Sequence, residues 1–381
     1  MDVIQAAKKI INQKSLEGND DAFYVMNLED VKIKYEHWVE KIPRVMPYYA
    51  VKCNDDEEVL KLLRDLGTGF DCASKKEILQ MLSLNVDSNK IIYAHTVKQI
   101  SHLKLSAEKG IKKVTFDSEA ELYKIKEFHP NSKVVLRIRF DASNSIINLG
   151  TKFGCNPITE APKLIELCKE LKINLFGIAF HVGSGTTDFG VYERALDAVR
   201  KLFDYAETMD IKMKFVDIGG GFIGKDLSIF DDYAKSINAG IERNFPSSDI
   251  EIISEPGRYF VDSAFSVVSQ VILKKHHEDG QIYYYLNESI YMSFLIAHLY
   301  KEQLEFSIIR ASEPEKEPKD KLSTVWGCTC NSRDKIIADR LIPELQMGDW
   351  IVFHNMGAYT TTVSTAFNGF QNLNIFGSAD L

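Results

Sequence analysis

The feature that most constrains the fold is a short strand-like run that recurs eight times, each followed by a polar stretch. The runs are Arg44–Lys52, Gly69–Ala73, Ile91–His95, Val114–Asp117, Lys133–Arg139, Leu175–Val182, Met213–Gly219 and Ile250–Glu255. Between them, stretches such as Asp56–Leu66 and Lys75–Leu84 place apolar residues at helical spacing. Strands that alternate with helices favour a parallel sheet. Eight such units predict an α/β chain with a closed (β/α)₈ TIM barrel.

After about residue 265 the helical stretches between the strand-like runs disappear. The later runs are Phe265–Lys274, Gln281–Leu286, Trp350–Phe353 and Asn374–Phe376, with Gly, Asn and Asp turns between them. This pattern predicts a second, mostly antiparallel β domain. Phe23–Leu28 reads as an extra strand of its sheet, and Glu313–Lys321 as a charged, proline-containing loop. We therefore expect a barrel over 29–264 and a β domain formed by 1–28 and 265–381.

Composition excludes several classes of protein. The 381 residues are 45% hydrophobic and carry a net charge of −8, which disfavours nucleic-acid binding because phosphate contacts need a basic face. No apolar run approaches the roughly 20 residues of a membrane helix, and Met1–Ile4 does not begin like a signal peptide. Six cysteines in this length suggest reduced thiols. The expected location is the cytoplasm.

A polar or charged residue stands near the end of nearly every barrel run. These residues are Lys52, Asp71, His95, Asp117, Arg137, His181, Asp217 and Glu255. Strand ends can be polar simply because they meet solvent. In a barrel, however, the carboxyl ends of all strands share the face on which active sites are built. A lysine, an arginine, two histidines and several carboxylates converging there predict an active site.

Two segments near the seventh and eighth runs could bind phosphate. Gly219-Gly220-Gly221 lets the backbone approach an anion closely, although glycines may also form only a tight turn. Glu255-Pro256-Gly257-Arg258 places an arginine beside them, and arginine recognises phosphate through paired hydrogen bonds. Barrels commonly bind phosphate after these two strands. Together the segments predict a phosphate cradle.

Lys52 follows the apolar run Tyr48–Val51 and could form a Schiff base. The alternative is a lysine that reaches solvent or pairs with Asp71. An aldehyde cofactor that carries a phosphate would explain the lysine, the phosphate cradle and a carboxylate such as Glu255 together. That cofactor is pyridoxal 5'-phosphate, whose ring nitrogen a carboxylate would keep protonated.

Cys328-Thr329-Cys330 could be half of a metal site, but no second cysteine pair or His–Cys cluster accompanies it. We therefore predict no metal. A reactive thiol near an active site and a buried structural thiol both remain possible readings.

Ten segments match, in order, the motifs of a known enzyme family. They are Pro47–Asp55, Gly69–Ser74, Lys152–Gly154, His181–Gly185, Asp217–Phe222, Glu255–Tyr259, Trp326–Cys330, Gly348–Trp350, Met356–Thr360 and Phe367–Phe370. The chain thus resembles the eukaryotic ornithine decarboxylase family of fold-type III pyridoxal-phosphate enzymes, whose fold is alanine-racemase-like. Asn287–Ser289 and Gly327–Cys330 are most similar to the short viral arginine decarboxylases of this family.

The resemblance implies a role for each matching residue. Lys52 would bind the cofactor covalently, His181 would stack on its ring, and Glu255 would pair with the pyridine nitrogen. The implied charge network is Asp71, Glu77 and Arg137. The implied phosphate and backbone contacts are Ser184, Gly219, Gly220, Gly221, Pro256, Gly257, Arg258 and Tyr359. Cys330 would protonate the carbon left after CO₂ departs, reaching across the interface of an obligate homodimer with shared active sites.

Departures from the family pattern fall where the substrate's side chain would bind. Ornithine-specific members carry an aspartate after the catalytic cysteine, where this chain has Asn331. They also carry an acidic residue that aligns with Tyr300, or with Lys301 after a one-residue gap. Only Glu302 nearby, or Asp334, could restore a carboxylate. A buried substrate ammonium without a carboxylate costs several kcal/mol.

The predicted activity is decarboxylation of ornithine to putrescine in polyamine biosynthesis, with a small amino acid as the substrate. Because the acidic residues are replaced, arginine, lysine or a neutral or aromatic amino acid remain alternatives. A regulatory homologue without catalysis, similar to antizyme inhibitors, is a second alternative, and an antizyme-like regulator is a possible partner. A racemase fits the barrel but not the cysteine segment.

Overall fold

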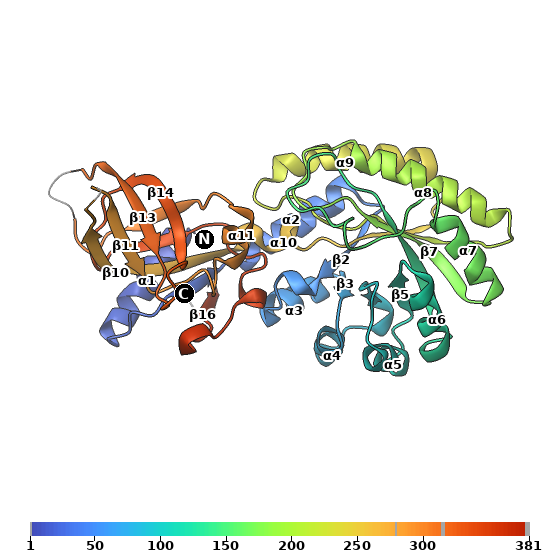
Figure 1. Cartoon of the computed structure of the whole chain (residues 1–381), viewed down its shortest axis with the longest axis horizontal. Coiled ribbons are helices and arrows are strands. Elements are labelled where there is room, and N and C mark those ends of the chain that lie inside the picture. Colours follow the sequence, from blue (N-terminus) through green and yellow to red (C-terminus); the bar gives the residue numbers. More distant parts are fainter. Residues whose placement is uncertain (1, 279, 314–316, 378–381) are drawn as a thin grey trace. The chain divides into compact units, whose positions relative to one another are not determined.

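In a computed structural model of the chain, residues 2–278, 280–313 and 317–377 are described (Figure 1). The fold consists of two compact units, one of residues 32–260 and one of residues 1–31 with 261–381. The domain boundaries predicted from the sequence, at 29 and 264, differ from these by three and four residues. Helix α2 (Leu28–Lys41) begins before the first boundary and ends after it.

Residues 32–260 form the predicted closed barrel. Its strands are β2 (Met46–Ala50), β3 (Gly69–Cys72), β4 (Ile91–Tyr93), β5 (Lys113–Phe116), β6 (Lys133–Arg139), β7 (Asn174–His181), β8 (Phe215–Asp217) and β9 (Glu251–Ser254). Each strand pairs in parallel with the next, and β9 pairs with β2 to close the ring. All eight strand-like runs of the sequence supply one strand each, so the barrel prediction is confirmed.

The helices alternate with the strands along the chain and surround the barrel (Figure 1). They are α3 (Glu57–Asp65), α4 (Lys75–Ser83), α5 (Ile100–Glu108), α6 (Glu119–Phe128), α7 (Ala161–Glu170), α8 (Val191–Glu207), α9 (Leu227–Asn244) and the short α10 (Arg258–Val261), with 3₁₀ turns at Val51–Cys53 and Ser88–Lys90. Local residues define the helix starts, since the Asp56 carboxylate accepts hydrogen bonds from the backbone N–H groups of Glu58 and Val59.

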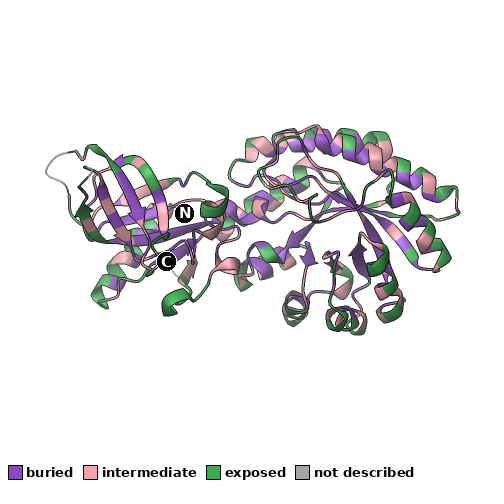
Figure 2. Ribbon diagram, viewed as in Figure 1, coloured by how far each residue is buried: buried purple, intermediate pink, exposed green. Residues whose placement is uncertain are grey.

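The barrel interior is filled by side chains from most of the strands. Its core cluster contains Tyr48, Ile92, Ala94, Val135, Ala179, Phe215 and Ile253. Strands β3, β4, β5 and β8 are buried along their whole length, as Figure 2 shows for the barrel generally. Burial on both faces is expected of a parallel sheet that is covered by helices. The barrel is therefore a packed scaffold, and its chemistry has to lie at the strand ends.

The other unit is a mostly antiparallel sheet with helix α1 (Val3–Leu16) and the short α11 (Leu295–Tyr300). Its strands are β1 (Phe23–Met26), β10 (Phe265–His276), β11 (Ile282–Leu286), β12 (Phe306–Ile309), β13 (Asp320–Trp326), β14 (Lys335–Pro343), β15 (Trp350–Phe353) and β16 (Asn374–Gly377). Short 3₁₀ turns cover Asp262–Ala264, Thr361–Val363 and Phe367–Gly369. As predicted, β1 joins this sheet, where it pairs with β10 and β16.

Strands β12, β13 and β14 were missed in the sequence, and part of the loop predicted over Glu313–Lys321 was wrong. Asp320 and Lys321 belong to β13, whereas residues 314–316 lie outside the described part of the chain. For β13 and β14 the strands were missed because their pairing is irregular: the register between them shifts at Ser323/Val325 and again at Val325/Trp326. Such shifts break the alternation of apolar and polar residues by which a strand is recognised.

The sheet unit has its own hydrophobic core. Helix α1 buries Ala6, Ala7 and Ile10 against Phe23, Val25, Val268, Ile309, Trp350 and Val352 of the sheet. The N-terminal segment is thereby held on strands that come from the far end of the sequence. Among the described residues, none of the helices is both long enough and apolar enough to cross a lipid bilayer.

Candidate active site

Lys52 and Asp71 form an ion pair at the carboxyl ends of two neighbouring strands. Lys52 lies in the 3₁₀ turn directly after β2, and Asp71 is in β3 opposite Ala50 of β2. The Lys52 ammonium contacts Asp71 Oδ2, and the Asp71 carboxylate is 0% exposed. The other oxygen, Oδ1, is buried without a hydrogen-bond partner. The buried carboxylate thus holds the lysine at the barrel mouth and keeps an unused acceptor beside it.

Two more carboxyl groups lie at the same end of the barrel. Asp217 ends β8 and accepts a 2.8 Å hydrogen bond from Gly219 N, and Glu255 follows β9 directly. Burial raises the pKa of Asp217 to about 7. Burial also raises the pKa of Glu255 well above its ordinary value, and the negative charges of Asp217 and Asp71 raise it further. Three carboxyl groups in one buried place favour a positively charged or proton-donating ligand group.

His181 ends β7 and is neutral in this environment. Burial lowers its pKa well below the usual value, and the positive charges of Arg137 and Lys52 lower it further. Gly183 N donates to His181 Nδ1 at 3.1 Å, so Nδ1 carries no proton and Nε2 carries it. A neutral imidazole of fixed tautomer is suited to stack on a flat ring.

Three backbone loops meet closely beside these side chains. The first is the glycine loop 219–221 after β8. A Cβ on its Gly220 would lie 2.1 Å from the Glu255 carbonyl oxygen. A Cβ on Gly221, whose φ is +92°, would lie 2.0 Å from the Gly183 carbonyl oxygen. Gly185 N donates to Gly221 O at 2.8 Å. Only glycine therefore permits this packing, which brings Ser184 and the glycine loop together.

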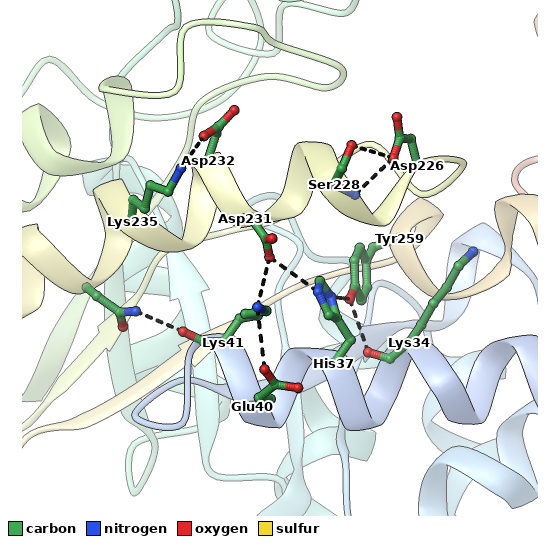
Figure 3. Close-up of polar contacts among 11 residues, drawn as sticks. Lys34, His37, Glu40, Lys41, Asp226, Ser228, Asp231, Asp232, Lys235 and Tyr259 are labelled. Carbon is green, nitrogen blue, oxygen red and sulfur yellow. Dashed lines mark hydrogen bonds and ion pairs between the residues drawn. The ribbon is translucent and has the colours of Figure 1, made fainter.

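Helix α10, which begins with Arg258, is anchored from the outside of the barrel. The Tyr259 hydroxyl donates to Lys34 O at 3.1 Å and lies 3.1 Å from His37 Nδ1 (Figure 3). The other ring nitrogen of His37 is 3.3 Å from Asp231 Oδ1, which also pairs with Lys41. The Tyr259 ring packs 4.5 Å from that of Phe230. These contacts join α10 to α2 and α9 and so fix the segment that presents Arg258.

The remaining barrel residues of the predicted site are placed differently. Arg137 lies inside β6 with its guanidinium 5.1 Å from the Phe153 ring centre. Glu77 accepts a 2.6 Å hydrogen bond from Ala73 N and so caps α4, a local structural role beside the implied charge network. Asp117 accepts a bond from Gly154 N at 2.8 Å, which fixes the segment that contains Phe153. The Pro256 carbonyl accepts a bond from Ala50 N, which joins the first and last strands.

The other predicted site residues belong to the sheet unit. Cys330 is exposed, and its backbone N–H donates to Asn368 Oδ1 at 2.9 Å. It lines a cavity of about 320 Å³ formed within this unit by Tyr285, Trp326, Gly327, Thr329, Cys330, Asn331, Ser332 and Asp334. All six cysteines are free thiols. The accessible thiol in a concave site fits the reactive reading of Cys330.

Asn331 is held by bonds within the sheet unit. Its Nδ2 donates to the Tyr291 hydroxyl at 2.7 Å, and its Oδ1 accepts from Arg333 N at 2.8 Å. Tyr300 ends α11 and is 40% exposed, and Lys301 takes a left-handed conformation that terminates the helix. Glu302 N donates to Ala297 O in the same turn.

From the sequence, Asp334 is one of two residues that could supply a carboxylate for the substrate's ammonium. Its two oxygens instead accept hydrogen bonds from groups of the sheet unit. It is buried and accepts hydrogen bonds from Ser289 Oγ, Ile290 N, Thr329 N and the Thr329 hydroxyl. This network holds the cysteine loop to the segment after β11. Ser289 supplies one of the donors.

Sequence reasoning assigned no role to Glu288 and Tyr291 of the sheet unit or to Tyr259 of the barrel unit. Glu288 is fully buried, and burial raises its pKa to about 7. Tyr291 positions Asn331, and Tyr259 anchors α10. The signal for Glu288 was its place just after an apolar strand, where a carboxyl group needs partners.

The structure also places Tyr359, a residue of the predicted phosphate site. It has a φ of +55° in the segment Met356–Thr360, whose backbone is fixed by the hydrogen bond from Met356 N to Phe265 O.

The barrel residues fit pyridoxal phosphate in chemistry and placement. An amine that can bind an aldehyde, a carboxyl group for a ring nitrogen, a neutral imidazole and a glycine-rich loop beside an arginine all lie after successive strands at one barrel end. The unused buried Oδ1 of Asp71 adds negative charge that a cationic ring system would balance.

Comparisons with known proteins agree with this arrangement. The sequence model of the family described as "Pyridoxal-dependent decarboxylase, pyridoxal binding domain" matches residues 28–262. Ornithine decarboxylase 2 of Drosophila melanogaster is 40% identical, with 96% of this chain and 93% of that protein covered. Antizyme inhibitor 2 of Xenopus laevis is 42% identical, with 96% of this chain and 82% of that protein covered.

Solved structures have the same fold. The crystal structure of the Paramecium bursaria Chlorella virus arginine decarboxylase bound to agmatine superposes with a TM-score of 0.93 and is 37% identical. The match covers 98% of this chain and 99% of that one, so both the barrel and the sheet unit are shared.

Proposed function

Because this chain belongs to the family of pyridoxal-dependent decarboxylases, we propose that it removes CO₂ from ornithine and releases putrescine for polyamine biosynthesis. The single observation that carries the enzymatic part is the barrel end at which Lys52, Asp71, His181 and Glu255 lie together. The choice of ornithine is supported by relatives such as the Drosophila enzyme.

In this proposal the barrel holds the cofactor. Lys52 binds it through its amine, the glycine loop and Arg258 hold the phosphate, and Glu255 faces the ring nitrogen. When bound, pyridoxal phosphate supplies an electron sink that accepts the electron pair left by CO₂. His181, which is buried and neutral, would stack on the ring and help to exclude water. Asp71 keeps Lys52 oriented through their ion pair.

Cys330 is proposed as the proton donor at the carbon that loses CO₂. Its thiol is exposed on a loop that Asp334 holds in place through Thr329. Cys330→Ala should still release CO₂ but protonate the wrong atom, so that part of the product is an aldehyde. An unchanged ratio of aldehyde to amine, measured by chromatography, would show that another group donates the proton.

We also propose that two copies share their active sites, with Cys330 supplied by the partner of the subunit that supplies Lys52. The test mixes the Lys52→Ala and Cys330→Ala proteins and measures only the amine product, which neither variant should form at the wild-type rate. If sites are shared, mixed dimers contain one intact site and regain roughly a quarter of the activity at equal ratios. Activity that stays at background after subunit exchange, confirmed by mass, would contradict shared sites.

The substrate assignment depends on how the pocket satisfies a distal ammonium. Asn331 offers an amide in place of a carboxylate, and Asp334 is committed to four donors. Glu302 is the exposed carboxylate closest in sequence to the family's acidic position. We propose that Glu302, with water, balances the substrate charge. Arginine is the second candidate substrate, favoured by the structural likeness to the viral arginine decarboxylase.

The deciding experiment measures CO₂ release by the cofactor-loaded protein from ornithine, lysine, arginine, and neutral and aromatic amino acids. Ornithine should give the highest kcat/KM. Preference for arginine, or for a neutral or aromatic residue, would replace the ornithine assignment while keeping the decarboxylase. Asn331→Asp should raise kcat/KM for ornithine, with Asn331→Ala as the matched control that removes the amide without adding charge.

A regulatory homologue without catalysis is the second candidate function, because antizyme inhibitor 2 of Xenopus laevis is among the similar proteins. Such a protein would show no cofactor absorbance and no CO₂ release. The presence of Lys52, Asp71, His181, Glu255 and Cys330 favours the enzyme. An antizyme-like partner and a cytoplasmic location remain parts of the proposal that binding and fractionation experiments would test.

A further inference from the structure

The opposite end of the barrel carries a cavity that the decarboxylase function does not use. It has a volume of about 380 Å³ and lies where strands β2, β4, β5, β6 and β9 begin. This volume is within the usual range for small-ligand pockets, about 300–1,000 Å³. The charged residues that line it are Lys90, Lys112, Lys113 and Lys133, with Asp87 and Glu251. Four ammonium groups face two carboxylates, in a chain whose net charge is −8.

The two acidic residues are already engaged. Glu251 pairs with the Lys113 ammonium at 2.6 Å, and Lys113 also donates to the Tyr48 hydroxyl at 2.8 Å. Asp87 accepts from Asn89 N at 2.9 Å and so caps the 3₁₀ turn before β4. Glu251 therefore offsets the charge of the innermost lysine, and Asp87 keeps its own charge because its donors are neutral, so that four lysines and two carboxylates leave the lining a net charge of +2.

Lys133 lies directly beside Lys113, because the two residues are register partners on the parallel strands β5 and β6. Like charges on adjacent strands repel and destabilise the pair. The Lys133 ammonium lies 4.3 Å from the Phe176 ring centre, and among the described residues no carboxylate pairs with it or with Lys112. The field of these lysines is focused by the low-dielectric barrel wall behind them.

We propose that this cavity binds a small anion that carries two or more negative charges, such as a di- or polyphosphate. Lys112 and Lys133 would contact the anion, and Lys90 would add charge at the rim, where its ammonium now donates to Gly67 O at 3.2 Å. Tyr48, Met46 and Ile91 form the remaining wall. The site lies at the amino ends of the strands and is therefore distinct from the cofactor site at their carboxyl ends.

The test titrates cofactor-loaded protein with inorganic pyrophosphate by calorimetry, without magnesium, so that the cofactor already fills its own phosphate site. Binding should weaken as salt is added. The double variant Lys112→Gln/Lys133→Gln should weaken it by about tenfold or more, because both ammonium groups that would contact the anion are lost. The double variant Lys126→Gln/Lys163→Gln, which also removes two positive charges but from helices α6 and α7 outside the cavity, is the matched control and should bind as the wild type.

Glu251→Gln should change the affinity for pyrophosphate in the direction opposite to the lysine variants. It removes a competing negative charge from the cavity wall and should strengthen pyrophosphate binding by about threefold or more. Citrate as a second probe separates phosphate recognition from binding of any polyanion, and tight binding of either supports the proposal. In wild-type protein, mass spectrometry should show that pyrophosphate protects Lys112 and Lys133 from acylation.

Several results would overturn this site. One is no binding of either anion at about 10 mM, a concentration that would detect even weak affinity. Another is binding that survives in the double lysine variant, which would place the anion elsewhere. Weaker binding in a folded Glu251→Gln protein would also contradict the proposed geometry, as would equal acylation of the two lysines with and without pyrophosphate.

Discussion

The two ends of the barrel both bury charged groups, but they do so in opposite ways. At the carboxyl ends of the strands, Asp71 keeps a buried oxygen without a partner, and Asp217 and Glu255 have raised pKa values. At the amino ends, the nearly buried Lys113 is satisfied by Glu251 and Tyr48. The unpaired carboxyl oxygens at the first end mark a site that a ligand completes, whereas at the second end the pairing of Lys113 is a structural contact beside Lys112 and Lys133, with which no carboxylate of the described residues pairs.

Of the substitutions that compare the two barrel ends, Lys52→Ala should have the largest effect. We expect kcat to fall by about a thousandfold or more, because the amine that binds the cofactor and releases the product is lost. The absorbance band of the lysine-bound cofactor should also disappear. Lys113→Met at the opposite end is the control, and its kcat should stay within about twofold of the wild type. Normal turnover in a folded Lys52→Ala protein would refute the assignment.

Asp217→Asn tests the raised pKa at the carboxyl end. Burial raises the folded-state pKa of Asp217 to about 7, whereas an unfolded aspartate titrates near 3.9. Between these values the folded chain holds a proton that the unfolded chain has lost. This contribution to stability is therefore full below about pH 4 and is lost as the pH rises through 7.

The stability of cofactor-free protein should accordingly fall more steeply between pH 5 and 8 in the wild type than in Asp217→Asn, with a difference of up to about 1.4 kcal/mol per pH unit. Denaturant unfolding at each pH measures this difference. Parallel pH profiles for the two proteins would mean that Asp217 is ionised at neutral pH.

Glu251→Ala tests the pairing of Lys113 at the amino ends. Loss of the carboxylate leaves the Lys113 ammonium, whose side chain is only 10% exposed, with the Tyr48 hydroxyl as its main partner. We expect the free energy of unfolding to fall by about 2 kcal/mol. Lys113→Met places an apolar chain against the rings of Tyr48 and Phe215 and should cost less than about 1 kcal/mol. Equal losses in the two variants would contradict this account.

Tyr259→Phe is expected to have the smallest effect. The change removes the hydroxyl that links α10 to Lys34 and His37 but keeps the aromatic packing (Figure 3). The dissociation constant of the cofactor should rise by about three- to tenfold, since one or two hydrogen bonds are worth about 1 kcal/mol. Fluorescence titration of cofactor-free protein measures this. Unchanged affinity would show that Arg258 does not depend on this anchor.

The sheet unit was harder to predict than the barrel. Barrel strands such as β6 and β7 are followed or preceded by helices, so the change between two periodicities marks their ends. Strand β14 contains Asp339 in a left-handed conformation, and its pairing with β13 shifts register. A strand whose alternation is interrupted resembles a loop in sequence, which is why β13 and β14 were missed.

The sequence by itself determined the (β/α)₈ barrel and the set of candidate residues at the carboxyl ends of its strands, because strand and helix periodicity is local and each candidate residue lies near the end of its own strand. Only the tertiary structure decided which charged groups meet. Asp334 accepts hydrogen bonds from Ser289 and Thr329, and Lys113 contacts Glu251 across 138 positions of sequence. Both contacts depend on strand register and burial. Register joins distant segments, and no local pattern of residues encodes it.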